Sequence, residues 1–417
     1  MKIHKNIIVG GGPIGCHVFN KFSKCSLLIT GKTKRLIYSR NLHPKIKLRL
    51  NKITNKFSDL FFSKKNNFCI YSSSEMGGFS NYWGKQFFDY QKKDLWPKEI
   101  FKKYSIYKKN LNEIDNIYLC PKYEVIKNII KKDLIFNQIK PPILKIPLIN
   151  RNNLIKKAKK KILEDRVISF NKIKKNLIMV ITENSTLYCR NLVLCAGPIG
   201  NAMILIRSFK RINYLTFKDD NPRMIFGFKF NKKDTLSKGD ENLADVDIIK
   251  NGNLVNYCTI YNVNPLHFNK FFKSIIFFLK NILTNFFFYG QYWVAGEYNE
   301  IKIKNASNKI VVSGKTKNSN IYKINIIKNL NKIGLKVIKI LNLKFAFGFH
   351  YHCLKVKYEG KLFTLNQFIN KQNLSNNVYC FDSSVIAKIG LKPPTKTYLA
   401  TANYLMKKFD NKLRLHL

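Results

Sequence analysis

Three glycines near the start of the chain have the spacing of a diphosphate-binding turn. Gly10, Gly12 and Gly15 occupy the glycine positions of the G-x-G-x-x-G pattern, with Pro13 and Ile14 between the last two. A tight turn, a close approach of the backbone to a diphosphate and a contact between helix and strand each exclude a side chain at these positions. The chemistry predicted for this segment is therefore the binding of a dinucleotide.

The residues on both sides of the turn predict the strand and the helix that must position it. Residues 6–9 form an apolar run typical of a buried parallel strand, and Ile14, Val18 and Phe22 recur every fourth residue, as on one face of a helix. Such a helix directs its free N–H groups and the positive end of its dipole at a diphosphate. This context favours a ligand-binding turn over a glycine turn that binds nothing.

The second predicted strand, residues 26–29, ends without the acidic residue that normally holds the adenosine ribose. Thr30 stands at its end, followed by Gly31 and Lys32, and offers one hydroxyl group instead of a carboxylate. The glycine turn and this strand therefore do not determine which dinucleotide is bound.

A loop over residues 74–84 carries further residues suited to a cofactor, namely Gly77, Gly78, Ser80, Asn81 and Trp83. Paired glycines let the backbone approach a flat ring or a phosphate, and short polar side chains beside them can form hydrogen bonds. We interpret this loop as part of the cofactor site.

Two later segments complete the set. Ala196 and Gly197 follow a predicted strand and precede an apolar helix, and ligands of parallel sheets lie outside the carboxyl ends of such strands. Asp382 follows another short apolar run, and Pro394 and Thr395 begin a predicted helix whose positive end can face an anionic ring.

The pattern between these segments predicts the organisation of the chain. Short alternating runs over residues 167–196 predict a β-meander that returns to a parallel strand, and Val167 at its start joins the candidate cofactor-binding residues. Residues 98–152 look helical and then irregular. Residues 219–344 mix strands with helices and lack a glycine fingerprint, so they are the candidate substrate lobe.

The order of the four glycine- and aspartate-bearing segments resembles that of the glucose-methanol-choline (GMC) family of FAD-dependent oxidoreductases. The run Gly-Gly-Phe-Ser-Asn-Tyr-Trp-Gly is most similar to the bacterial branch found beside polysaccharide-assembly genes. The resemblance implies noncovalent FAD, with the first glycines on the pyrophosphate and residues 77–81 near the flavin. It also implies that Asp382 lies near the pyrophosphate or the ribityl chain.

The same resemblance implies a catalytic histidine that takes the proton of an alcohol while hydride leaves for the flavin. His350 stands at the matching place and is the predicted base, with His352 as the alternative. A neutral imidazole with a pKa of about 6.5 can accept a hydroxyl proton at neutral pH. Pro393 departs from the family, which usually has a second His or Asn just before the last helix.

These observations predict an α/β protein with two domains. A discontinuous Rossmann-like FAD-binding domain, with a parallel sheet and a β-meander, would comprise residues 1–97, 156–215 and 346–417, the last segment with the catalytic His. An α+β substrate domain with an antiparallel sheet would comprise a lid segment, 98–155, and residues 216–345.

The chain is strongly basic, with 75 Lys and Arg against 24 Asp and Glu in 417 residues and a formal net charge of +51. Because the excess is almost all Lys and is spread along the chain, we interpret it as solvated surface rather than a specific nucleic-acid interface. No helix-turn-helix, zinc-finger or RNP-like pattern accompanies it. A basic nucleic-acid-binding protein with a vestigial Rossmann lobe and an NAD(P)-dependent dehydrogenase remain the alternative functions.

Nine single cysteines predict neither a disulfide framework nor a metal site, and they favour a reducing compartment. The first strand leaves no room for a signal peptide, so a cytoplasmic location is expected. The apolar segment Phe268–Tyr289 is interrupted by lysines, which favours a buried or interfacial helix, with peripheral membrane contact as the alternative. The expected partners are an alcohol substrate, either a small molecule or a glycan, and an electron acceptor that the sequence does not name.

Overall fold

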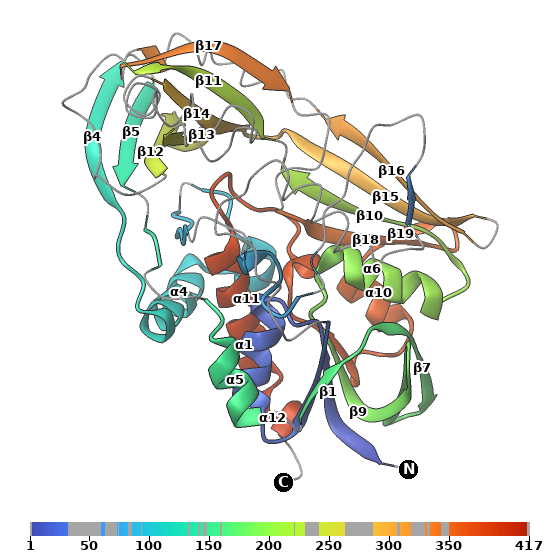
Figure 1. The fold of residues 1–417 in the computed structure, drawn as a ribbon. Helices are drawn as coiled ribbons and strands as arrows, with labels where there is room; N and C mark the ends of the chain where they lie inside the picture. The colour runs from blue at the N-terminus through green and yellow to red at the C-terminus, as the bar shows by residue number, and fades with distance from the viewer. Residues whose placement is uncertain are drawn as a thin grey trace, which may run out of the picture.

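The computed structural model describes residues 2–31, 60–62, 73, 75–81, 86–92, 94–131, 134–140, 142–144, 148–158, 161–220, 222–229, 242–262, 287–306, 309–317, 330–331, 334–342 and 350–414. Three β-sheets organise this part of the chain (Figure 1). The first sheet and its helices form the lower half of the view, and the other two sheets lie above them.

The first sheet contains the predicted dinucleotide-binding strands in the order β6-β2-β1-β9-β8-β7. Its strands are β1 (Ile3–Val9), β2 (Ser26–Thr30), β6 (Ile162–Glu164), β7 (Val167–Lys174), β8 (Leu177–Thr182), β9 (Thr186–Leu194) and β20 (Val378–Cys380). The strands β6, β2, β1 and β9 are parallel, and β20 adds a parallel partner to the end of β9. The strands β7, β8 and the start of β9 form an antiparallel meander. The predicted parallel sheet with a β-meander is confirmed.

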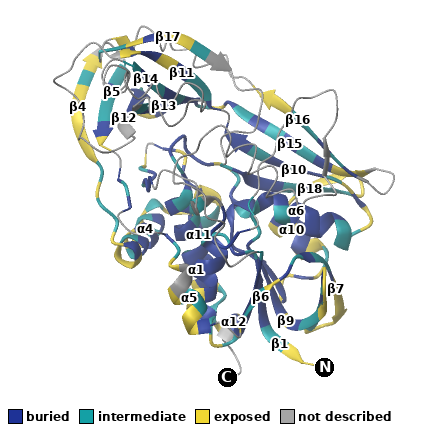
Figure 2. Cartoon of the chain, in the orientation of Figure 1, coloured by how far each residue is buried: buried dark blue, intermediate teal, exposed yellow. Residues whose placement is uncertain are grey.

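Helices cover both faces of this sheet because alternate residues of its strands face two separate cores. Ile8 packs with α1 (Pro13–Phe22), α4 (Tyr104–Tyr118) and α11 (Thr395–Lys408), whereas Ile7 and Val9 pack with α6 (Gly197–Ser208) and the second sheet. The shorter helices are α3 (Lys98–Phe101), α5 (Arg151–Ala158), α10 (Leu365–Lys371), α12 (Asp410–Arg414) and the 3-10 turns η1 (Gly78–Asn81) and η5 (Ser383–Val385). Figure 2 shows the buried residues concentrated where α1, α11 and the first sheet meet.

The face of α1 predicted from the sequence is the one that the structure buries. Ile14, Val18 and Phe22 are all less than a tenth exposed and lie in one core cluster. The four-residue spacing therefore identified the helix and its inner face correctly.

The second sheet has the order β19-β18-β10-β15-β16-β3, with all neighbours antiparallel except β16 and β3. Its strands are β3 (Leu60–Phe62), β10 (Ile212–Asp220), β15 (Tyr298–Ala306), β16 (Lys309–Lys317), β18 (His352–Tyr358) and β19 (Lys361–Thr364). The predicted FAD-binding segments therefore supply β3, β18, β19 and the start of β10 to this sheet. The predicted domain boundaries themselves stay a prediction.

The third sheet is antiparallel, with the order β17-β11-β14-β13-β12-β5-β4. Its strands are β4 (Glu124–Lys131), β5 (Leu134–Lys140), β11 (Arg223–Lys229), β12 (Asn242–Lys250), β13 (Asn253–Asn262), β14 (Phe287–Val294) and β17 (Leu335–Asn342). Two strand pairs, β10 with β11 and β14 with β15, follow one another along the chain and connect the second and third sheets. These antiparallel sheets confirm the predicted fold class.

One expectation about local structure was wrong, and a second is tested only at its last three residues. The segment expected to be irregular after α4 forms the hairpin β4–β5, which pairs with β12. Its sequence does not alternate between apolar and polar residues, because Val125, Ile126 and Ile130 are apolar and yet exposed. Of the predicted helix over Phe268–Tyr289, residues 268–286 lie outside the described residues, and residues 287–289 begin strand β14. Phe and Tyr favour strands as readily as buried helices, so this apolar run was ambiguous.

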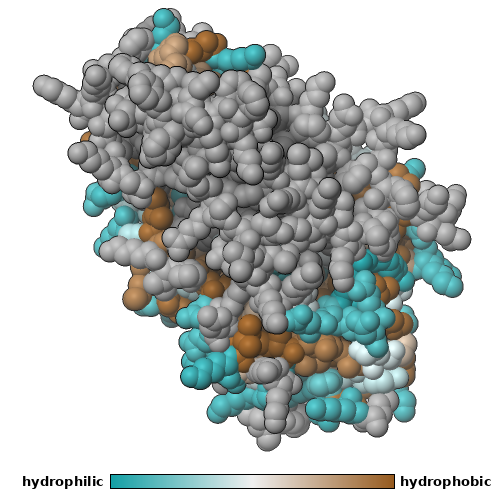
Figure 3. Space-filling view, viewed as in Figure 1, coloured by the Kyte–Doolittle hydropathy of each residue, from teal (hydrophilic) through white to brown (hydrophobic). Residues whose placement is uncertain are grey.

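The described surface is mixed in polarity. In the view of Figure 3, hydrophilic side chains lie along the lower and right margins with hydrophobic patches between them. None of the helices in the described ranges is long and apolar enough to cross a membrane.

Candidate functional site

The glycine turn at the end of β1 leaves no room for side chains at two of its glycines. Gly10 has a φ of +107°, and a Cβ there would lie 2.6 Å from Cα of Ala196, at the end of β9. A Cβ at Gly15 would overlap the carbonyl oxygen of Gly10. The turn is thus packed against both its own helix and the neighbouring strand.

Gly12 differs from these two because the space around it is open. A Cβ at Gly12 would meet none of the described residues within 4 Å, and the residue has an ordinary φ of −67°. Gly12 is the N-cap of α1, which has no side-chain cap and carries Pro13 in its first turn. The backbone N–H groups of this helix start therefore face space that an anionic group can occupy.

The loop with the paired glycines packs directly on this turn. Gly77 donates its N–H to the carbonyl oxygen of Gly11 at 2.6 Å, and a Cβ at Gly78 would lie 3.3 Å from Cα of Gly12. The Ser80 hydroxyl donates to the carbonyl oxygen of Gly77 at 2.6 Å and so closes the loop on itself. Only the backbone of Asn81 is described, and Trp83 lies outside the described residues.

Thr30 lies under the same turn, at the end of β2. Its side chain is so close to Gly11 that a Cβ at Gly11 would overlap the Thr30 hydroxyl. The Thr30 residue is 2% exposed, and its Oγ1 has no hydrogen-bond partner within the described part of the chain. A buried hydroxyl of this kind is costly unless a ligand or water satisfies it.

The loop after β6 also reaches the end of β2, where Asp165 donates its N–H to the carbonyl oxygen of Thr30 at 3.0 Å. The Asp165 carboxylate accepts hydrogen bonds from Thr182 and Asn184, so it is committed to the protein. Val167 follows at the start of β7 with its side chain in the core, and can reach a ligand only through its backbone.

Asp382 joins the third and fourth predicted segments. Its Oδ2 accepts the N–H of Gly197 at 2.7 Å and the amide of Asn201 at 2.9 Å, and its Oδ1 accepts the N–H of Ser384 at 2.9 Å. The side chain is buried, and this burial raises the pKa of Asp382 despite those hydrogen bonds. Asp382 thus positions the backbone of Gly197, and with it the start of α6, at the carboxyl ends of β9 and β20.

A buried lysine stands beside the start of α11, whose N-cap is Pro394 and whose first residue is Thr395. Lys392 is 1% exposed, and its Nζ lies 2.8 Å from Asp247 in the third sheet and 3.8 Å from Asp94. The two carboxylates raise the pKa of Lys392 and outweigh its burial. This ion pair connects the third sheet to the helix that follows the Asp382 segment.

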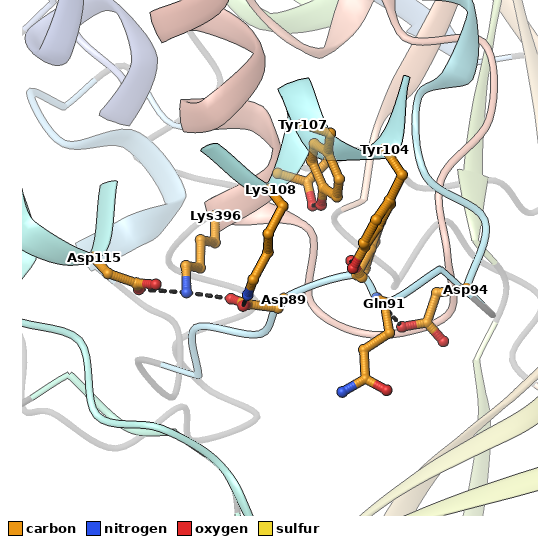
Figure 4. Close-up of polar contacts among 10 residues, drawn as sticks. Asp89, Gln91, Asp94, Tyr104, Tyr107, Lys108, Asp115 and Lys396 are labelled. Atoms are coloured by element: carbon orange, nitrogen blue, oxygen red, sulfur yellow. Dashed lines mark hydrogen bonds and ion pairs between the residues drawn. The ribbon is translucent and has the colours of Figure 1, made fainter. Parts of the chain in front are cut away.

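A second buried lysine fixes the first turn of α11 to α4 (Figure 4). Lys396 pairs with Asp89 and Asp115, and Lys108 of α4 also pairs with Asp89, at 2.8 Å. The Tyr107 hydroxyl lies 2.7 Å from Oγ1 of Thr397. The start of α11 is therefore held from several directions.

The two candidate catalytic histidines differ in their surroundings. His352 is 3% exposed, its Nδ1 lies 2.9 Å from the carbonyl oxygen of His350, and burial lowers its pKa although Asp220 opposes this effect. His350 keeps 13% of its side-chain surface exposed, stacks on Trp293 and faces Asp220, with 3.6 Å between Nδ1 and Oδ2.

The structure brings most of the predicted residues to one region. This region lies at the carboxyl ends of β1, β2, β9 and β20. It contains the glycine turn, the loop over residues 75–81, Thr30 and the hydrogen bond between Gly197 and Asp382. Strand β18, which begins at His352, packs on η5, the turn that Asp382 caps, and the Tyr398 hydroxyl of α11 lies 3.5 Å from the carbonyl oxygen of Tyr351.

Sequence reasoning missed several of the residues that build this region. Asp219 and Asp220 form the only Asp-Asp pair of a chain that is poor in acidic residues, which was an available signal. Nothing in the sequence placed Trp293 beside His350 or Asp247 beside Lys392, because these contacts join strands far apart in the chain.

No model of a known protein family matches the chain, and no curated protein matches its sequence. Among solved structures, a variant of formate oxidase from Aspergillus oryzae RIB40, studied for its FAD modification, aligns over 99% of this chain and 99% of its own, at 10% identity and a TM-score of 0.48. Bacillithiol disulfide reductase Bdr from Staphylococcus aureus aligns over 47% of this chain and 39% of its own, at 14% identity and a TM-score of 0.20. Likenesses of this size assign neither a family nor a function to the chain.

Proposed function

We propose that the protein is an FAD-dependent oxidoreductase that removes hydride from an alcohol group. The observation that carries this proposal is that four separate segments of the chain come together in one region, the candidate cofactor site. The four segments are the glycine turn, the paired-glycine loop, the Gly197 turn and the Asp382 segment. They span 372 positions of the sequence, from Gly10 to Asp382, and they meet at the ends of four parallel strands.

The residues of this candidate cofactor site fit a dinucleotide. Gly12 leaves open space at the N-terminus of a ten-residue helix, where a diphosphate is favoured by free N–H groups and the helix dipole. The unpartnered Thr30 hydroxyl at the end of β2 is placed to satisfy a ribose hydroxyl. The paired glycines bring backbone rather than side chains to the turn, which suits a flat ring.

When bound, FAD would accept the hydride from the alcohol carbon. The chain itself would take the hydroxyl proton, and His350 suits this role better than His352 because its ring is partly exposed. The Nδ1 of His352 faces a carbonyl oxygen, which can only accept, so that nitrogen must carry its own proton. The GMC resemblance of the sequence points to the same histidine pair.

The finer parts of the proposal follow from that resemblance. They are membership of the GMC family, a sugar or glycan precursor as substrate, a role in polysaccharide biosynthesis, and a cytoplasmic location with membrane contact at most peripheral. The electron acceptor is a separate molecule, and the basic surface serves no specific nucleic acid.

The test is to purify the protein and record its visible spectrum, followed by anaerobic addition of alcohols. We expect a yellow protein with flavin absorbance that a sugar alcohol or related alcohol bleaches. The variant His350→Ala should keep its FAD and lose bleaching, whereas His352→Ala should keep its FAD and bleach more slowly than wild type. A folded protein that binds NAD(P)H and no FAD would instead establish the dehydrogenase alternative.

A further inference from the structure

His350 is held through its backbone and through one face of its imidazole ring. Its own backbone N–H donates to Oδ1 of Asp219 at 2.9 Å, and its carbonyl oxygen accepts a hydrogen bond from Nδ1 of His352. The indole of Trp293 stacks on the ring, with centroids 5.9 Å apart and planes 10° apart. Such positioning is more than a residue packed only for stability requires.

The two aspartates that act on His350 are consecutive residues at the end of β10. Successive side chains of a strand point to opposite faces, so Asp219 and Asp220 reach different parts of the same residue. Asp219 holds the backbone, and Asp220 lies at the Nδ1 edge of the ring. Both are buried, at 0% and 8% exposure, in a chain whose acidic residues are scarce.

The chemistry of the Nδ1 edge allows one arrangement. Nδ1 of His350 and Oδ2 of Asp220 are both buried, and neither has another hydrogen-bond partner in the part of the chain described. They lie 3.6 Å apart, which is longer than the usual 2.7–3.2 Å of such a bond and within reach of a small ring rotation. A hydrogen bond at this edge has one possible direction: a carboxylate only accepts, so the bond would place the proton of the neutral ring on Nδ1.

We propose that Asp220 is a positioning residue that keeps His350 in the Nδ1–H form, so that the lone pair of Nε2 is free to accept the substrate hydroxyl proton. This inference rests on the proposed function for its consequence in catalysis. The tautomer itself is a property of the chain alone. Asp219 and Trp293 complete the arrangement by fixing the backbone and the ring plane, so that Nε2 keeps one direction.

The structure also explains why His352 does not compete for Asp220. Its Nδ1 already meets the carbonyl oxygen of His350, so the second histidine orients the backbone of the first. Because His352 is also more deeply buried than His350, we assign it to supporting His350 rather than to accepting the substrate proton.

The test measures the ring nitrogens directly. The purified protein is labelled with 15N-histidine, and the His350 signals are identified by their loss in His350→Asn. We expect the 15N shifts of wild type at neutral pH to show Nδ1–H, and those of Asp220→Ala to show Nε2–H, the form that free histidine prefers. Asp220→Glu, which keeps a carboxylate, should restore Nδ1–H.

The matched control is Glu300→Ala on the neighbouring strand β15. Glu300 pairs with Lys315 at 3.5 Å rather than with His350, so its loss should leave the tautomer unchanged. Wild-type protein in the Nε2–H form, or an Asp220→Ala variant still in the Nδ1–H form, would overturn the proposal. The wild-type spectrum alone decides it if Asp220→Ala fails to fold.

Flavin bleaching provides the second readout. Asp220→Ala should bleach at least tenfold more slowly than wild type with unchanged FAD content, while Asp220→Glu recovers part of the rate. If no alcohol bleaches the wild-type flavin, the proposed function fails, and the tautomer result still decides the role of Asp220. If alcohols bleach it and Asp220→Ala reacts at the wild-type rate, the role of Asp220 is refuted and the proposed function stands.

Discussion

The open space at Gly12 gives a direct way to separate binding of the dinucleotide from folding. In Gly12→Ala the new methyl group would touch no residue in the ranges that the structure describes, and the φ of −67° is one that alanine adopts freely. Alanine is a poorer N-cap than glycine by some tenths of a kcal/mol, so we expect the free energy of unfolding of the FAD-free protein to change by less than about 1 kcal/mol.

The same methyl group would occupy the space from which a diphosphate reaches the helix N-terminus. Loss of one hydrogen bond to a charged group costs about 1.5–3 kcal/mol. Since about 1.4 kcal/mol corresponds to a factor of ten, the affinity for FAD should fall by about 10- to 100-fold. The assay is titration of the FAD-free protein followed by flavin fluorescence, with urea unfolding of the same samples.

Gly10→Ala is the contrasting variant. Here the positive φ and the contact with Ala196 predict a loss of stability of about 1–3 kcal/mol even without FAD. Gly12→Ala protein that binds FAD as tightly as wild type would refute the placement of the diphosphate. If Gly12→Ala and Gly10→Ala lowered the free energy of unfolding equally, the inferred difference in space around the two glycines would be refuted.

Two further predictions concern buried titratable groups. Burial lowers the pKa of His17 to about 4, and its Nδ1 meets the Tyr118 hydroxyl. The unfolded chain, with a pKa of about 6.5 at this residue, therefore binds the proton first, and stability is lost as the pH falls from about 6.5 towards 4. Urea unfolding should show about 2 kcal/mol lost through this residue between pH 8 and 5, a component that His17→Gln lacks; equal pH dependence of the two proteins would contradict the assignment. Lys392→Met should lower the free energy of unfolding by about 3–5 kcal/mol, because it removes the cation that lies 2.8 Å from buried Asp247, and Lys392→Met/Asp247→Leu should recover part of this loss in the same assay. A single variant as stable as wild type would show that the ion pair contributes nothing.

Local patterns were sufficient to predict the first sheet. The β1 run, the glycine spacing and the four-residue repeat of Ile14, Val18 and Phe22 each describe contacts within about twenty residues, the range over which periodicity is informative. The β-meander after Val167 was recognisable for the same reason, because its strands are neighbours in sequence.

The third sheet was harder to predict because its strands depend on partners far along the chain. The hairpin β4–β5 joins β12 across more than one hundred positions, and its own pattern lacks alternation. For the candidate site, residue types predicted Gly12, Asp382 and His350, but not their partners. Trp293 and Asp220 become neighbours of His350 only through the pairing of β10, β14 and β15 with strands of two sheets.

The scarcity of acidic residues makes their location informative. The chain has 24 Asp and Glu against 75 Lys and Arg, so an acidic side chain on the surface would find cations almost anywhere. Yet a set of aspartates is buried around the start of α11 and the end of β10: Asp94, Asp219, Asp220, Asp245, Asp247 and Asp382. Burying a carboxylate costs several kcal/mol unless it is paired or hydrogen-bonded, so stability alone does not favour this placement. These carboxylates hold a lysine, a backbone N–H or a side-chain amide, or face a ring nitrogen, which suits the proposed site, where a cofactor and a base must be oriented.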